Sequence, residues 1–205
     1  QTGVYRVYMA ETIVVSGYER YGTKRNPNPS SEVVLPALRE RYAGLVATVV
    51  LPAAYDAALD TLKGTIREVW PETVVMFGTS QSAADPFRLE LRARNWRESK
   101  TPDNLGQNFK GKIMLGMPDF LASTLPLENI ADEMDEHEVP YRWSDSAGTF
   151  VCNDTFYQAL HYTARLSRLE HVPNVSTGLI HFGRELTKQV VEQGAYAVVD
   201  AVTGE

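Results

Sequence analysis

The 205-residue chain has a single cysteine, Cys152, and no apolar run long enough to span a membrane. One thiol cannot form a disulfide within the chain, so nothing in the sequence indicates secretion, and we expect a reducing, cytoplasmic location. Acidic residues outnumber basic ones by 26 to 20, which gives a formal net charge of -6. Because phosphate contacts need clustered Lys and Arg, nucleic acid is not an expected partner.

The sequence also lacks internal repeats and low-complexity tracts, and its histidines and cysteine do not have zinc-ligand spacing. We therefore predict no metal and no cofactor. A chain of this length fits one domain with one substantial core. Residues 1–8 lack the charged-then-apolar pattern of a signal peptide. We expect them to be an added leader before a native start at Met9, with a single domain over 9–205.

Strands and helices are predicted to alternate. Apolar and β-branched runs predict strands at 12–16, 45–51, 73–78, 87–95, 141–143 and 178–182. Apolar residues at helical spacing predict helices at 54–70, 127–137, 153–166 and 184–202. Ser30 or Ser31 can cap a further helix that reaches Tyr42. In the helix at 127–137, Ile130 and Met134 form the apolar face, and the acidic residues are expected to face solvent.

Several of these strands are apolar on both faces, which is typical of the α/β class. We predict a three-layer α/β/α sandwich with a mostly parallel, twisted central sheet. Such sheets bind ligands at the carboxyl ends of their strands.

Cys152 lies in the run Ser146-Ala-Gly-Thr-Phe-Val-Cys-Asn153, where small residues precede a predicted helix. A thiol at a helix start faces unpaired backbone N–H groups and the positive end of the helix dipole. Both favour the thiolate, which is the nucleophilic form. A lone cysteine is more often a buried small hydrophobe, and its placement alone leaves that alternative open.

A cysteine nucleophile needs a base, and the base needs an orienting group. Of the four histidines, His181 ends an apolar strand, whereas His161 follows Cys152 by nine residues in the same helix and points from another face. The alternative for His181 is a hydrogen-bonded core histidine.

Glu90 is the candidate orienting group. Alternation along the strand at 87–95 puts it on one face with Arg88, Arg92 and Arg94. Its alternative is a solvated charged face on which it pairs with these arginines. The residues alone permit a Cys–His–Glu triad without requiring one.

Six motifs follow one another along the chain: Gly17-Tyr-Glu-Arg-Tyr-Gly22 with Asn28-Pro-Ser30, Glu90 with Asn95, Pro102-Asp-Asn104 with Gly106, Ser123-Thr-Leu-Pro126, Ser146 to Asn153, and Gly178-Leu-Ile-His181. In this order they resemble pyroglutamyl peptidase I, or pyrrolidone-carboxylate peptidase, a family of cysteine peptidases. The resemblance runs from about Ile13 to Val190. It places the family's nucleophile at Cys152 and its catalytic histidine at His181.

The resemblance implies removal of an N-terminal pyroglutamyl residue from a peptide without a metal. Cys152 is then the nucleophile, His181 the base and Glu90 the residue that orients the base. The substrate is expected to contact Tyr18, Tyr21, Asn28, Thr79, Lys100 and Val151. Family analogy further implies a homotetramer.

Departures from the family pattern concentrate in the substrate pocket. Tyr18 and Tyr21 stand where the family has two phenylalanines that enclose the lactam ring, and each adds a hydroxyl that needs a partner if buried. The family's Gly-Gln-Ala-Gly-Gly-Arg stretch becomes Gly-Thr-Ser-Gln-Ser-Ala at 78–83, and Lys100 replaces an arginine. Three alternatives follow: a true pyroglutamyl peptidase, a cysteine hydrolase for a more polar cyclic or blocked N-terminal group, and a catalytically silent binding protein of the same fold.

Overall fold

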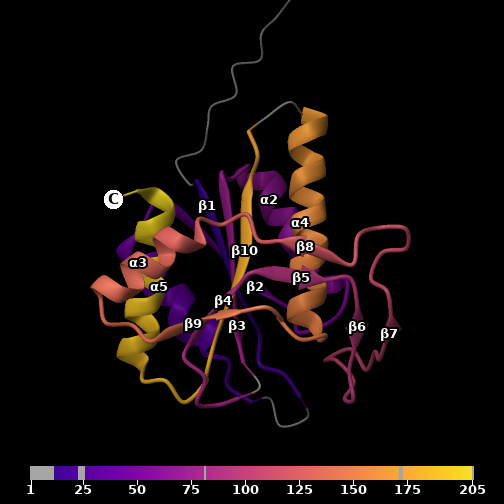
Figure 1. Ribbon diagram of the computed structural model, residues 1–205, viewed down its shortest axis with the longest axis horizontal. Helices are drawn as coiled ribbons and strands as arrows, with labels where there is room; N and C mark the ends of the chain where they lie inside the picture. Colours follow the sequence, from indigo (N-terminus) through magenta and orange to yellow (C-terminus); the bar gives the residue numbers. More distant parts are fainter. Residues whose placement is uncertain (1–11, 23–25, 81, 171–172, 205) are drawn as a thin grey trace, which may run out of the picture.

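The computed structural model describes residues 12–22, 26–80, 82–170 and 173–204 (Figure 1). The leader expected at 1–8 lies outside these residues, and the single domain stays a prediction. A central sheet has the strand order β2-β1-β3-β10-β4-β9. In that order the strands are Val46–Leu51, Ile13–Tyr18, Thr73–Thr79, Ser176–Phe182, Phe87–Glu90 and Tyr141–Ser144. Neighbouring strands pair in parallel, except that β10 and β4 are antiparallel. The mostly parallel sheet is confirmed.

Helices cover both faces of this sheet, so the three-layer sandwich is confirmed. One face packs against α1 (Leu35–Arg41), α3 (Leu127–Glu136) and α5 (Lys188–Thr203). The other packs against α2 (Ala57–Val69) and α4 (Val151–Glu170). Figure 1 shows α3 and α5 together on one side of the sheet and α2 and α4 on the other. In α2 and α3 the buried residues include those that the helical spacing predicts.

The strand expected over 87–95 is wrong in its second half. β4 ends at Glu90, and the N–H of Leu91 donates to the carbonyl of Ser144. The chain then leaves the sheet, and β5 (Arg92–Arg94) pairs with β8 (Phe120–Ala122) in a separate ribbon. A second ribbon joins β6 (Arg97–Glu98) to β7 (Lys110–Gly111). Both ribbons lie beside α4 (Figure 1).

The helix expected to start at Ser30 or Ser31 also differs. A π-helical turn, η1 (Ser30–Val34), comes first, and α1 follows with Pro36 in its first turn. The residue at the N-cap of η1 is Pro29, which makes no capping hydrogen bond, and the N–H of Ser30 donates to Asn28 Oδ1. The Ser30 hydroxyl also donates to Asn28 Oδ1 (2.7 Å) and accepts from the N–H of Tyr18 (3.0 Å). The serine therefore holds the loop after β1 and does not cap a helix.

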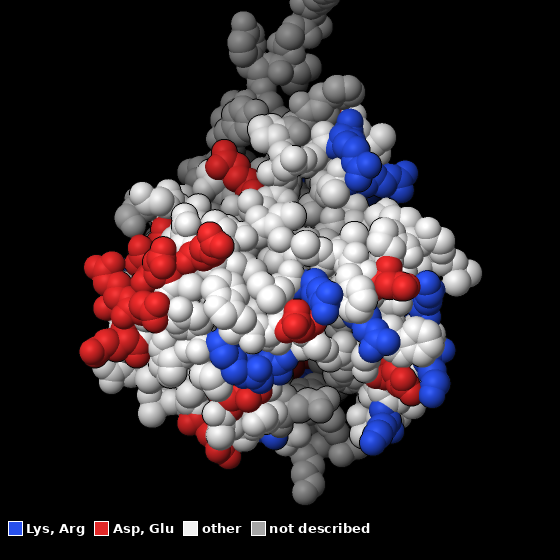
Figure 2. Space-filling view, in the orientation of Figure 1, with Lys and Arg blue, Asp and Glu red and all other residues white. Residues whose placement is uncertain are grey.

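Acidic side chains gather over α3, as Figure 2 shows at the left of the molecule. Ile130 and Met134 are fully buried beneath them, so the predicted division of this helix into apolar and solvated sides is confirmed. In the part of the chain that the structure describes, no helix is long and apolar enough to cross a membrane.

Candidate active site

Three neighbouring strands bring the central residues into one row. Gly78 of β3 lies opposite His181 of β10, and His181 lies opposite Arg88 of β4. Glu90 comes two residues after Arg88, so its side chain is on the same face and diagonal to His181. His181 and Gly78 are each one residue before the ends of their strands. The row thus lies at the edge of the sheet where parallel α/β folds bind ligands.

Glu90 and His181 form a buried hydrogen-bonded pair. His181 Nδ1 is 2.8 Å from Glu90 Oε1, and the two residues are 4% and 0% exposed. A carboxylate only accepts hydrogen bonds, so Nδ1 donates, and Nε2 is the ring nitrogen left to face Cys152. Burial by itself lowers the pKa of His181, but hydrogen bonds and charge interactions with Cys152 and Glu90 raise it to about 9. The solvated charged face is excluded for Glu90, because its side chain is fully buried, although the pairing with a neighbouring arginine is present: Arg88 Nη2 lies 3.1 Å from Glu90 Oε1.

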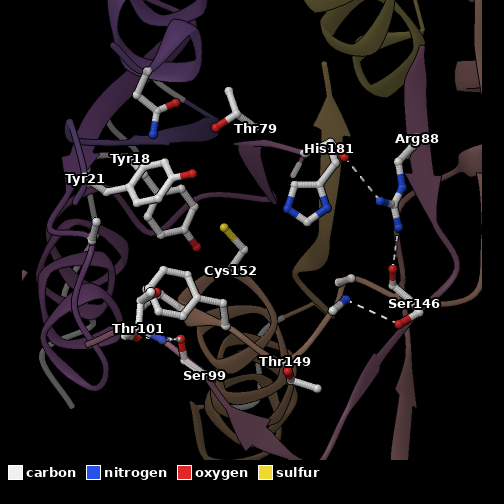
Figure 3. A pocket seen from close by; sticks show the side chains of 17 residues that line it. Tyr18, Tyr21, Thr79, Arg88, Ser99, Thr101, Ser146, Thr149, Cys152 and His181 are labelled. Carbon is white, nitrogen blue, oxygen red and sulfur yellow. Dashed lines mark hydrogen bonds between the residues drawn. The ribbon is translucent and has the colours of Figure 1, made fainter. Parts of the chain in front are cut away.

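Cys152 is the second residue of α4, and its side chain is partly exposed. A methyl group added to Gly78 would lie 2.9 Å from His181 Nε2 and 3.3 Å from Cys152 Sγ. Both atoms therefore approach the same bare piece of backbone in β3. Figure 3 shows the sulfur between the two tyrosines and the imidazole of His181.

A cavity of about 580 Å³ opens onto Cys152 and His181. Five of the six residues that the sequence predicts to contact substrate line it, namely Tyr18, Tyr21, Asn28, Thr79 and Val151. Lys100 is exposed and is not among the lining residues, although Ser99 and Thr101 beside it are. The ammonium group of Lys100 therefore does not form part of the cavity wall.

The two tyrosines form the wall opposite His181 (Figure 3). Tyr18 is only 2% exposed, and its hydroxyl lies near Cys152 and Thr155 without a well-formed hydrogen bond to either. Burial raises the pKa of Tyr18 well above its usual value, and the nearby charge of Cys152 adds to this rise, so the hydroxyl is neutral and can donate. Tyr21 packs on Phe150 with ring centroids 6.4 Å apart, and Phe150 packs in turn on Tyr55.

Two motifs that are distant in sequence interlock beside this wall. Asn104 Nδ2 donates to Glu19 Oε1 and to the carbonyl of Arg20, both at 2.8 Å. The N–H of Gly22 donates back to Asn104 Oδ1. The turn at 102–104 therefore fixes the loop that carries Tyr18 and Tyr21.

Two residues that build the site are not predicted from the sequence. A solvated face is one of the two alternatives for the arginines of the strand at 87–95, yet the Arg88 side chain is only 17% exposed and lines the cavity. Asn153 is fully buried next to Cys152 and binds the backbone of the segment at 94–96. The one signal for Asn153 is its place in the motif around Cys152, and no local pattern marks Arg88. Among the described residues, no three His, Cys, Asp or Glu side chains are grouped to hold a metal ion.

A thiol at a helix start, a buried imidazole beside it and a carboxylate bonded to that imidazole form the arrangement that cysteine hydrolases use. The family model for pyroglutamyl peptidase matches residues 11–200. The chain therefore belongs to the pyroglutamyl peptidase family, and the resemblance found in the sequence is confirmed.

Relatives and solved structures agree with this assignment. A pyrrolidone-carboxylate peptidase of Erwinia tasmaniensis is 35% identical over 156 residues, which are 75% of this chain and 72% of that protein. One from Pyrococcus furiosus is 28% identical over 175 residues, or 82% of this chain and 83% of that protein. The crystal structure of Bacillus amyloliquefaciens pyroglutamyl peptidase I matches with a TM-score of 0.84 at 23% identity, covering 95% of this chain and 98% of the other. That last likeness supports the α/β fold.

Proposed function

We propose that the chain is a cysteine omega-peptidase that hydrolyses the amide bond after an N-terminal pyroglutamyl residue. The observation that carries this proposal is the buried Glu90–His181 pair beside Cys152 at the mouth of one cavity. Membership of the pyroglutamyl peptidase family supports the same substrate class.

Catalysis then proceeds through a thioester. His181 holds a proton on Nε2 beside the Cys152 thiolate, and Glu90 stabilises that imidazolium. The thiolate attacks the pyroglutamyl carbonyl carbon, and backbone N–H groups at the start of α4 stabilise the oxyanion. His181 gives its proton to the leaving nitrogen, the C–N bond breaks, and the shortened peptide departs with a free amine. Water then gives a proton to His181 as it attacks the thioester, which releases pyroglutamate and restores the thiolate.

Tyr18 and Tyr21 enclose the ring in this proposal. A second candidate substrate, a more polar cyclic or blocked N-terminal group, is favoured by the unpartnered Tyr18 hydroxyl. A buried donor without a partner costs about 1–3 kcal/mol, and an extra acceptor on the ring would recover that energy. Plain pyroglutamate offers only its lactam and scissile carbonyl groups for this purpose.

The test is release of a fluorophore from a pyroglutamyl-amide reporter by the parent protein and by Cys152→Ala. We expect turnover by the parent and none by Cys152→Ala. A panel of peptides with other blocked N-termini separates the two candidate substrates, since a clear preference for pyroglutamate rejects the more polar one.

A reactivity measurement tests the catalytically silent alternative. Iodoacetamide should alkylate Cys152 far faster than a free thiol, and His181→Ala should remove that advantage. Alkylation at the ordinary rate in the parent would contradict a catalytic thiol.

Two further proposals concern assembly and location. Family analogy supports a homotetramer, which sedimentation velocity would test. The single cysteine supports a cytoplasmic location.

A further inference from the structure

The guanidinium of Arg88 lies at the far end of the Glu90–His181 pair. One of its nitrogens, Nη2, is 2.7 Å from Ser144 Oγ and 3.1 Å from Glu90 Oε1, and it also donates to the carbonyl of Ser146. Figure 3 shows Arg88 beyond His181 with its bond to Ser146. Three oxygens from β4, β9 and the following segment therefore meet at one –NH₂ group.

The same oxygen of Glu90 contacts both the His181 ring and the Arg88 guanidinium. Oε1 is 2.8 Å from His181 Nδ1 and 3.1 Å from Arg88 Nη2, while Oε2 is buried without a partner. Two positive groups that share one carboxylate oxygen lie within about 6 Å of each other, the range in which a charge shifts a neighbour's pKa. The Arg88 charge therefore opposes protonation of His181, which Glu90 favours.

Arg88 also connects Glu90 to the segment that leads to the nucleophile. Ser146 begins the run that leads through Gly148, with a φ of +79°, to Cys152. Its carbonyl is held by the same nitrogen that binds Glu90. A fixed carbonyl at Ser146 sets where α4 starts relative to His181.

We propose that Arg88 is a positioning residue of the reaction: it ties the segment that carries Cys152 to the carboxylate that orients His181, and its charge limits how firmly Glu90 keeps a proton on His181. This role rests on the proposed function, because it requires Cys152 and His181 to be the reacting pair. It accounts for an arginine in the cavity wall that is only 17% exposed and whose Nη2 is directed at protein oxygens.

Other charges near His181 must be separated from that of Arg88. Glu90 faces it from β4, Cys152 from α4, and the neutral Tyr18 stands across the cavity on β1. Asp85, before β4, is 3.6 Å from Arg88 Nη1 and 3.4 Å from Arg142 Nη2. Arg142 lies opposite Arg88 in the β4–β9 register. Arg142→Gln thus removes a neighbouring charge from Asp85 and leaves the contacts of Glu90 intact, which makes it the matched control.

The experiment titrates the His181 ring by NMR in histidine-labelled protein, with the signal assigned by its loss in His181→Ala. In Arg88→Gln we expect the His181 titration to move upward by about one pH unit. We also expect kcat/KM for the reporter to fall by at least about tenfold, because the nucleophile and base are no longer held together. Arg142→Gln should change the midpoint by no more than a few tenths of a unit.

Arg88→Lys separates charge from geometry. It keeps the charge but replaces the planar guanidinium, whose Nη1 also reaches Asp85, by a compact ammonium on a flexible stem. We therefore expect the parent titration and a reduced kcat/KM. If Arg88→Gln does not fold, Arg88→Lys alone provides the test. An upward shift of the His181 titration in Arg88→Lys as large as that expected for Arg88→Gln would overturn the electrostatic role. A folded Arg88→Gln with the parent titration and parent kcat/KM would overturn the whole proposal. Activity that persists in Cys152→Ala would instead refute the proposed function, whatever Arg88 does.

Discussion

Gly78→Ala tests the contact between the thiol and the imidazole. The added methyl would lie 2.7 Å from His181 Cδ2, 2.9 Å from Nε2 and 3.3 Å from Cys152 Sγ. Carbon atoms pack favourably at about 3.5–4.0 Å, so the ring has to move by about 1 Å. Gly78 and His181 are paired in the β3–β10 register, which leaves ring rotation as the easiest response. That rotation lengthens the 2.8 Å bond from His181 to Glu90.

A displacement of about 1 Å in a catalytic group costs about 100-fold in rate, and we expect this fall in kcat/KM for the pyroglutamyl reporter. Overpacking should lower the free energy of unfolding by about 1–3 kcal/mol, which a domain of this size tolerates. Thermal unfolding followed by circular dichroism checks that the variant is folded at the assay temperature.

Gly64→Ala is the matched control. Gly64 lies inside α2, and nothing is within 4 Å of the added methyl. This variant should keep full activity and gain about 0.5–1 kcal/mol from better helix propensity. Full activity in Gly78→Ala, with an unchanged melting temperature, would refute the close approach of Cys152 and His181 at this point of the sheet.

Three further substitutions test the surroundings of the site. Burial raises the pKa of Asp154 from 3.8 to about 6, although Arg97 opposes the rise. The folded state then binds the proton more tightly than the unfolded state, so the parent loses about 3 kcal/mol as pH rises through that window. Asp154→Asn should remove this loss, and denaturant unfolding at about pH 3.5 and about pH 7.5 measures it. Tyr18→Phe should stabilise the fold by about 1 kcal/mol because the hydroxyl is buried without a partner, and a lower melting temperature would contradict this. Asn153→Ala removes three hydrogen bonds to the segment at 94–96 and should cost about 2–4 kcal/mol of unfolding free energy; a loss below about 1 kcal/mol would mean that the segment is held elsewhere.

The sequence by itself determined the class of fold and the position of the nucleophile. β1, β2 and β3 are short apolar runs bounded by turn residues, and α2 and α3 have the period of amphipathic helices, so local pattern was enough to find them. Cys152 is conspicuous as the sole cysteine before a helix, and the ordered motifs gave it a family. These features are encoded within about ten residues of chain.

Tertiary structure alone decided what surrounds the thiol. The alternation at 87–95 permitted both a solvated face and a catalytic carboxylate for Glu90. Alternation of polar and apolar residues indicates which side chains are buried only when one face of the strand meets water. Glu90 meets His181 across 91 residues of sequence, and Arg88 meets Ser146 across 58. The antiparallel pairing of β10 with β4 brings His181, Arg88 and Glu90 together. No local pattern specifies which strand becomes the neighbour of another. A buried ion pair is set by partners that only folding brings together, which is why the sequence could name Glu90 and His181 as candidates while the fold made them a pair.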